Sequence, residues 1–215
     1  MKINKKLIKY NYSSRKGVKI KSIVIHDTGN QSATADAENH YKYFSGGNRQ
    51  ASAHYFVDDK QILQIIEDSN AAWHAGDGKG KYGITNANTL GIEICVNKGA
   101  DYLKAVQSTI ELTAYLMQLH DIPIEEVIRH YDASRKNCPA SMSKNNWEAW
   151  RAFKVALERE VKKVPNGIKV NIKGKDHYME GIFQNDKNYV GVRELAETLG
   201  HVVTWDQNTK TVIIK

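Results

Sequence analysis

The sequence contains only two cysteines, Cys95 and Cys138, among 215 residues. Two cysteines are too few for the disulfide frameworks that stabilise small secreted domains, so reduced thiols or a single thiolate ligand are the expected use. No run of 18 consecutive apolar residues is present, which argues against a transmembrane helix. The first residues also lack the apolar stretch of a secretory signal, so we expect no signal-directed export.

The net charge of +7 is concentrated near the N-terminus, where residues 1–21 contain eight Lys and Arg residues and no acidic residue. A concentrated basic segment of this kind would be attracted to nucleic acid or to an anionic cell-wall polymer. The alternative is an ordinary solubilising surface. No recognised nucleic-acid-binding motif is present, so we expect no nucleic-acid partner.

Short apolar strands and amphipathic helices alternate over the first three quarters of the chain. The patterns predict strands at residues 21–26, 51–57 and 90–97, and helices at residues 32–44, 101–120 and 146–163. Alternation of this kind predicts an α/β fold with one sheet flanked by helices.

A different pattern begins after residues 165–167, whose sequence Pro-Asn-Gly breaks the last helix. Two strands, a short helix and two further strands are expected beyond it. We therefore predict two domains, residues 1–164 and a small α+β domain of residues 165–215. A composition with 41% hydrophobic residues can supply one good core and a small second module.

Three potential metal ligands, His26, His130 and Cys138, lie at predicted strand ends or in the loops that follow them. A catalytic zinc ion takes three His, Cys or carboxylate ligands and leaves its fourth position for water. A lone histidine is more often structural, so the types and positions of these residues alone leave both readings open.

One carboxylate interrupts the predicted strand at residues 90–97. Glu93 shares a face with Cys95, whereas Ile92 and Ile94 point to the opposite face. Either Glu93 serves chemistry or it is an exposed carboxylate on an edge strand, and Cys95 is most simply a small buried hydrophobe.

The segments HDTG (residues 26–29), GIEI (91–94) and RHYDASRKNCP (129–139) occur in this order. With them, residues 20–160 resemble the type 2 N-acetylmuramoyl-L-alanine amidases, a family that includes zinc-dependent phage lysins and peptidoglycan recognition proteins. The resemblance implies a central mixed sheet flanked by helices, zinc held by His26, His130 and Cys138, and peptidoglycan as the substrate. The amide between N-acetylmuramic acid and L-alanine would be the bond cleaved.

The resemblance also implies roles for two further residues. Glu93 would take the proton of a zinc-activated water and pass it to the leaving amine, and Lys136 would stabilise the developing oxyanion. Some members use a tyrosine at a position that corresponds here to Ala53, and this absence gives Glu93 more weight.

The WHAG loop (residues 73–76) borders the glycopeptide groove in similar lysins. Trp73 and His74 are therefore expected to bind substrate, although packing of Trp73 in the protein interior is an open alternative. His54 is expected to fill the core.

The tail sequence YVGVRELAETLGHVVTWDQNTKTVIIK resembles a repeat of bacterial surface proteins that is named after the N-terminal domain of copper amine oxidases. The residues that carry the resemblance are Arg193, Leu199, Gly200, Trp205 and Asp206. It implies a cell-wall-binding domain without copper, and the alternative is a packing domain with no ligand. Anionic cell-wall polymers are possible partners of the basic segment.

Two rival functions remain at this stage: a non-catalytic peptidoglycan receptor, and a hydrolase with Cys138 as nucleophile and His130 as its base. The absence of a signal suggests a protein made in the cytoplasm and released to the wall like a phage lysin, with secretion by another route as the alternative.

Overall fold

The computed structural model describes residues 1–163, 168–179, 181–184, 187–206 and 211–215. The chain divides into two compact units, Met1–Lys162 and Lys163–Lys215. The domain boundary expected at residues 164 and 165 lies outside the described residues. Among those residues no helix is long and apolar enough to cross a membrane.

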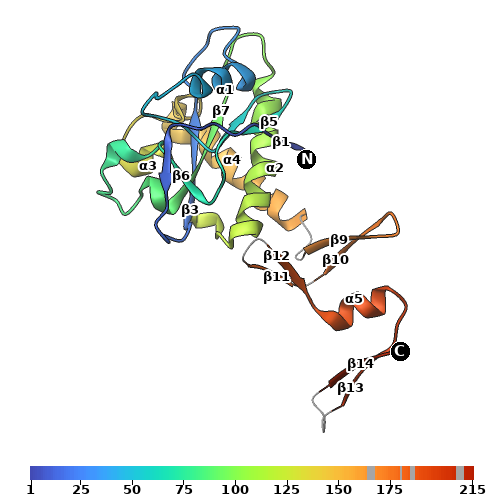
Figure 1. The fold of residues 1–215 in the computed structure, drawn as a ribbon. Helices are drawn as coiled ribbons and strands as arrows, with labels where there is room; N and C mark the ends of the chain where they lie inside the picture. The colour runs from blue at the N-terminus through green and yellow to red at the C-terminus, as the bar shows by residue number, and fades with distance from the viewer. Residues whose placement is uncertain (164–167, 180, 185–186, 207–210) are drawn as a thin grey trace. The chain divides into compact units, whose positions relative to one another are not determined.

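The first unit is built on a six-stranded mixed sheet with the order β1-β5-β4-β7-β3-β8 (Figure 1). Its strands are β1 (Ile3–Lys5), β3 (Ser22–Asp27), β4 (Tyr55–Val57), β5 (Ile62–Gln64), β7 (Thr89–Ile94) and β8 (Val127–Arg129). Within this sheet β4 and β5 pair antiparallel, and the other neighbouring strands are parallel. A separate antiparallel pair is formed by β2 (Tyr12–Ser14) and β6 (Asn70–Ala72). The prediction of an α/β fold with a mixed sheet flanked by helices is confirmed.

Helices cover both faces of this sheet. They are α1 (Ala37–Ser45), α2 (Tyr102–His120), α3 (His130–Ser134) and α4 (Lys144–Lys163), with short 3-10 turns η1 (Gly76–Gly78), η2 (Asn86–Asn88), η3 (Ile124–Glu126) and η4 (Ala140–Met142). On one face, Ala37 and Phe44 of α1 pack against Phe56 and Leu63. The expected helix at 32–44 begins later because the side chain of Asp36 accepts the Asn39 amide and caps it.

The register of the central strands determines which side chains share a face. His26 on β3 pairs with Glu93 on β7, and Glu93 pairs with Phe56 on β4. Since paired residues on neighbouring strands point the same way, His26 and Glu93 emerge side by side. Both lie toward the carboxyl ends of their strands, the edge of a parallel sheet where ligand sites gather.

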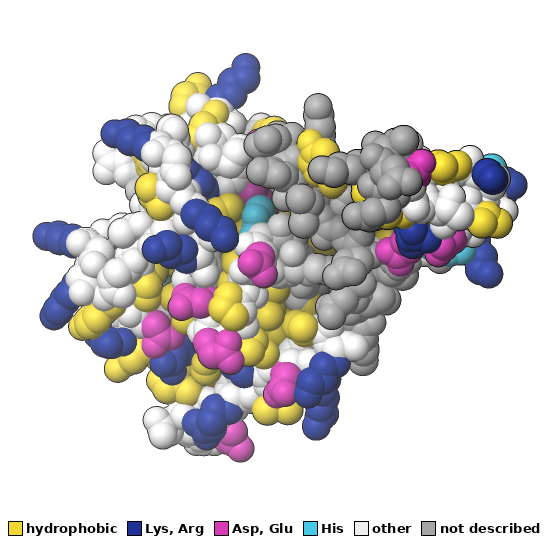
Figure 2. Space-filling view, turned by 90° about the horizontal axis from the view of Figure 1, so that it is seen from below, with side chains coloured by type: hydrophobic (Ala, Val, Ile, Leu, Met, Phe, Trp, Pro, Cys, Tyr) yellow, Lys and Arg dark blue, Asp and Glu magenta, His cyan; other side chains and the backbone are white. Residues whose placement is uncertain are grey.

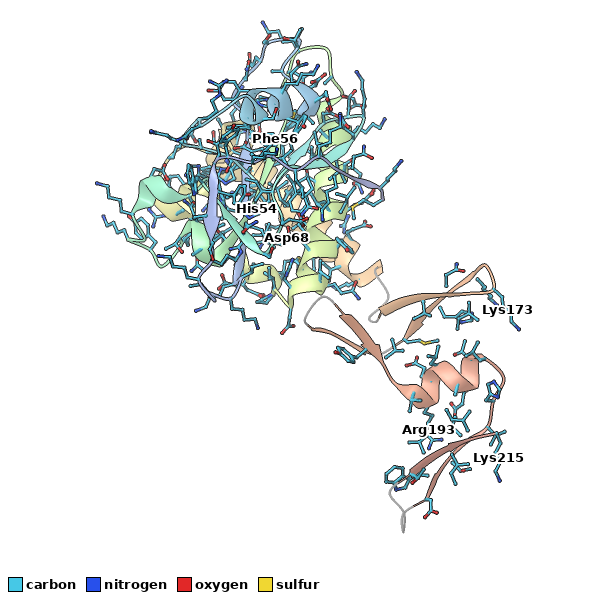
Figure 3. All side chains as sticks on the ribbon, in the orientation of Figure 1. His54, Phe56, Asp68, Lys173, Arg193 and Lys215 are labelled. Carbon is cyan, nitrogen blue, oxygen red and sulfur yellow. The ribbon has the colours of Figure 1, made fainter. Side chains whose placement is uncertain are left out.

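The basic N-terminal segment is folded into the first unit. β1 and β2 each pair with another strand, and Arg15 is only 6% exposed. Its guanidinium donates to the carbonyl oxygens of Asp68 (2.7 Å), Ala87 (2.6 Å) and Thr89 (2.9 Å). It also lies 3.0 Å from His54 Nε2. His54 and Asp68 are both labelled within this unit in Figure 3.

The lysines of the same segment lie on the surface. Lys5 and Lys6 form ion pairs with Glu67 and Glu38. On the face seen in Figure 2, basic side chains are scattered among acidic and apolar ones instead of forming one patch. The solubilising reading therefore suits these lysines, whereas Arg15 stabilises the fold.

In the part that the structure describes, the second unit contains three antiparallel strand pairs and the helix α5 (Val192–Thr198). Its strands are β9 (Ile168–Ile172), β10 (Lys175–Met179), β11 (Gly181–Gln184), β12 (Lys187–Val190), β13 (Val203–Asp206) and β14 (Thr211–Ile214). Among its described residues four strands precede α5, not the two expected, because residues 177–184 contribute to both β10 and β11 and a further strand, β12, lies directly before the helix. Its cell-wall-binding role stays a prediction.

We predict that Arg15→Ala lowers the free energy of unfolding by ~3 kcal/mol, because it leaves several buried carbonyl oxygens without a donor. Lys16→Ala, at the exposed neighbouring position, is the matched control and should change stability by less than ~0.5 kcal/mol. Urea denaturation of both variants measures the difference. Equal stability of the two variants would contradict the structural role of Arg15.

Candidate metal centre

Three side chains converge at the carboxyl end of β3. His26 lies in β3 itself, His130 directly follows the adjacent strand β8, and Cys138 lies in the loop after α3. His26 Nδ1 is 3.1 Å from His130 Nδ1 and 3.8 Å from Cys138 Sγ. The three ligand atoms lie within 4.8 Å of one another, and all three residues are buried. The structure thus brings the three predicted ligands together as a possible metal site.

His130 lies at the end of a strand, as expected, but it is also the first residue of the short helix α3, where a loop was expected to follow. The helix starts there because the side chain of Asp132 accepts the backbone N–H of Arg129, and it also receives two hydrogen bonds from the Arg129 guanidinium. Parallel pairing of Ile25 with Arg129 then places His130 beside His26.

Asp77 fixes the orientation of the His130 ring, a contact that the sequence did not reveal. His130 Nε2 lies 2.8 Å from Asp77 Oδ1, and Ser134 Oγ donates to Asp77 Oδ2 at 3.0 Å. Partial burial acts against ionisation, but the contacts with His130 and Ser134 lower the pKa of Asp77 overall. A carboxylate on the outer nitrogen leaves His130 Nδ1 free to bind a cation.

His74 contacts Nε2 of His26, as Asp77 contacts Nε2 of His130. His74 Nδ1 lies 3.0 Å from His26 Nε2, and His74 Nε2 lies 3.2 Å from Thr89 Oγ1. Burial, and then the neighbouring histidines, hold the pKa of both His26 and His74 well below the usual value. Both rings are therefore neutral at neutral pH, with one donor nitrogen and one acceptor nitrogen each.

Glu93 lies next to this cluster in the interior of the sheet. β7 runs between β4 and β3, so the edge-strand alternative was wrong. Glu93 Oε1 is 4.0 Å from His26 Nδ1, and its side chain is 19% exposed. Within the described part of the chain, Oε2 is buried without a hydrogen-bond partner. Burial, assisted by Asp27 and opposed by Lys136, raises the pKa of Glu93 to about 8.

A pocket of about 490 Å³ opens beside His130. It is lined by Gln50, Ala51, Trp73, His74, Gly76, Asp77, Asn86, His130 and Lys136. Lys136 is exposed, as a residue that meets a ligand should be, and Trp73 is partly exposed. Both of these predicted site residues therefore line the same pocket as His130, whereas His26, Cys138 and Glu93 are not among its lining residues.

Other candidate residues lie away from the pocket. His54 is fully buried, accepts the Gly91 amide on Nδ1 and contacts Arg15, which agrees with its expected place in the core. Cys95 packs with Ala53 in the apolar cluster around Phe56. Cys95 and Cys138 are both free thiols, so Cys138 is available as a ligand.

The chain is similar to several proteins that are named N-acetylmuramoyl-L-alanine amidases. Residues 16–141 match the family model described as N-acetylmuramoyl-L-alanine amidase. The chain is 34% identical to the N-acetylmuramoyl-L-alanine amidase CwlA of Bacillus subtilis (strain 168), over 76% of this chain and 60% of CwlA. It is 36% identical to CwlH of the same organism, over 61% of this chain and 50% of CwlH. The chain thus spans only about half the length of these curated relatives.

Two solved structures resemble the first unit closely. A mutant endolysin from Bacillus subtilis shares 34% identity with a TM-score of 0.65, and the match covers 73% of this chain and 99% of that one. The catalytic domain of XlyA shares 32% identity with the same TM-score and the same coverage. The match therefore covers nearly all of both solved chains, one of which is a catalytic domain.

Proposed function

The chain belongs to the N-acetylmuramoyl-L-alanine amidase family, and from this premise we propose that it is a zinc-dependent peptidoglycan hydrolase. The bond cleaved is the amide between N-acetylmuramic acid and L-alanine. The observation that carries the proposal is the convergence of His26, His130 and Cys138 beside the unpartnered carboxylate oxygen of Glu93. The names of the relatives CwlA and CwlH support the choice of substrate.

The donor set fits zinc in type, and the two distances from His26 Nδ1 to the other ligand atoms are close to those of a zinc site. Tetrahedral zinc with bond lengths of ~2.05 Å to nitrogen and ~2.3 Å to sulfur separates two nitrogens by about 3.3 Å, and a nitrogen from a sulfur by about 3.6 Å. The corresponding distances are 3.1 and 3.8 Å. If Nε2 carries the ring proton in both His26 and His130, the lone pairs of the two Nδ1 atoms face each other at 3.1 Å. A cation between them relieves that repulsion.

When bound, zinc would lower the pKa of a coordinated water to ~7 and polarise the scissile carbonyl. Glu93 accepts a proton from the attacking water as the new C–O bond forms. It then delivers that proton to the amide nitrogen as the C–N bond breaks, which releases a neutral amine. Burial raises the pKa of Glu93 to about 8, which favours the protonated form that donates to the amide nitrogen.

Two residues of the pocket complete the proposed site. Lys136 brings a positive charge to the pocket beside His130, where it stabilises the oxygen that becomes negative during attack. Trp73 offers an indole face that can pack on a sugar ring of the glycan.

The two rival functions are less consistent with these residues. A non-catalytic receptor has no need of a complete ligand set with a carboxylate beside it. As a nucleophile, Cys138 would need a lowered pKa, but burial, followed by the charge of Glu93, raises the pKa of Cys138 to about 12. The family assignment and the Glu93 position favour hydrolysis by activated water.

The proposed function is tested by the ends that appear when purified peptidoglycan is digested. Cleavage of the proposed amide creates one new N-terminal alanine per event and no reducing sugar. Dinitrophenylation of the digest detects the former, and a reducing-sugar assay detects the latter. New reducing ends would identify a glycosidase and contradict the proposal.

Metal removal separates zinc hydrolysis from cysteine catalysis. Dialysis against a strong chelator should abolish lysis, and addition of one equivalent of zinc should restore it. Cys138→Ser should lower both zinc content and activity, because it removes the soft thiolate ligand. Full activity of a chelator-treated protein whose zinc content is verified as zero would support Cys138 as a nucleophile instead.

Glu93→Gln should reduce the rate of hydrolysis by ~10²–10⁴-fold, the range expected for loss of a general acid–base group. The amide keeps the shape of the side chain, so bound zinc should stay at the wild-type ratio by atomic absorption. Glu148→Gln, at an exposed position on α4, is the control and should keep full activity. A fully active Glu93→Gln variant would exclude the proton role.

A further inference from the structure

His74 is buried at the floor of the site, between a potential metal ligand and a strand. Only 9% of the residue is exposed. Its two ring nitrogens lie 3.0 Å from His26 Nε2 and 3.2 Å from Thr89 Oγ1. Although the residue lines the pocket, both of its polar ring atoms are already occupied by protein partners. This arrangement differs from the substrate contact expected from the WHAG sequence.

The carbonyl oxygen of Thr85 ends this series of hydrogen bonds and fixes the direction of each of them. Thr89 Oγ1 donates its single hydrogen to the carbonyl oxygen of Thr85, at 2.6 Å, because a carbonyl can only accept. Thr89 Oγ1 must then accept from His74 Nε2. A neutral His74 is left with an unprotonated Nδ1, which accepts from His26 Nε2. His26 Nδ1 is therefore the nitrogen that carries the lone pair.

A neutral His74 is consistent with its surroundings. The ring makes edge contacts with the rings of His26 and His54, at centroid distances of 5.1 and 5.7 Å. A buried positive charge among other nitrogen rings would have to be desolvated without compensation. The hydrogen-bond directions above therefore hold for the form of His74 that this site favours.

Several contacts hold His74 in this orientation. Asn86 Oδ1 accepts the backbone amides of His74 (3.0 Å) and Ala75 (2.7 Å). Gly91 lies directly beneath the imidazole, where an added Cβ would be 2.6 Å from His74 Cγ. Arg15 in turn donates to the carbonyl oxygen of Thr89. The ring thus rests on a glycine and between fixed backbone groups.

We propose that His74 and Thr89 are positioning residues that fix the tautomer of His26, so that its Nδ1 faces His130 and Cys138 as a metal ligand. The expected effect on zinc binding rests on the proposed zinc centre, but the tautomers can be observed in the metal-free protein. Thr89 acts through His74 and touches neither substrate nor metal.

The tautomers are read from two-bond ¹H–¹⁵N correlation spectra of the metal-free protein, which distinguish the two ring nitrogens of each histidine. We expect the proton on Nε2 in both His26 and His74. A proton on His26 Nδ1 would overturn the proposal, even if the protein proves to be a zinc amidase. Conversely, failure of wild-type protein to bind zinc would refute the proposed function without altering this spectrum.

The consequence for metal binding is tested with Thr89→Val, which removes the hydroxyl and keeps the shape. Zinc affinity, measured by competition with a chromogenic chelator, should fall by ~10–100-fold, the usual effect of losing such an outer contact. Thr89→Ser restores the hydroxyl and should restore affinity. Thr109→Val is the matched control, because Thr109 is also fully buried and donates to the carbonyl four residues earlier. Equal zinc affinity in Thr89→Val and Thr109→Val would overturn the proposal.

Discussion

The parallel pairing of β3 with its two neighbours is the constraint on which the site depends. One partner, β7, places Glu93 beside His26, and the other, β8, ends where His130 begins. A slip of one residue in either pairing would turn the carboxylate or the imidazole to the opposite face of the sheet. Apolar side chains on the far face, such as Ile25 and Ile92, are fully buried and resist such a slip.

The cost of burying so many polar groups in this region is offset by specific partners. Asp77 contacts His130. His74 contacts His26, and Thr89 in turn contacts His74. Arg15 supports the segment that carries Thr89 and also contacts His54. The N-terminal segment therefore contributes to the geometry of the site, although none of its residues is a predicted ligand.

The sequence predicted the parts of the site that depend on local pattern or on the family resemblance. Strand alternation separated Glu93 from Ile92 and Ile94, and the ordered segments singled out His26, His130 and Cys138. It could not reveal the roles of Asp77, His74 and Arg15. Asp77 meets His130 from 53 residues away, and Arg15 meets Thr89 from 74 residues away. Such contacts depend on tertiary packing, and nothing in a glycine-rich loop or a run of basic residues indicates them.

The central claim is that two imidazoles and one thiolate form a single metal site. X-ray absorption at the zinc edge of the zinc-loaded protein measures this ligand shell directly. The account predicts one sulfur at ~2.3 Å together with nitrogen or oxygen neighbours at ~2.0 Å. A shell without sulfur, made of light atoms alone, would contradict the role of Cys138 and with it the proposed centre.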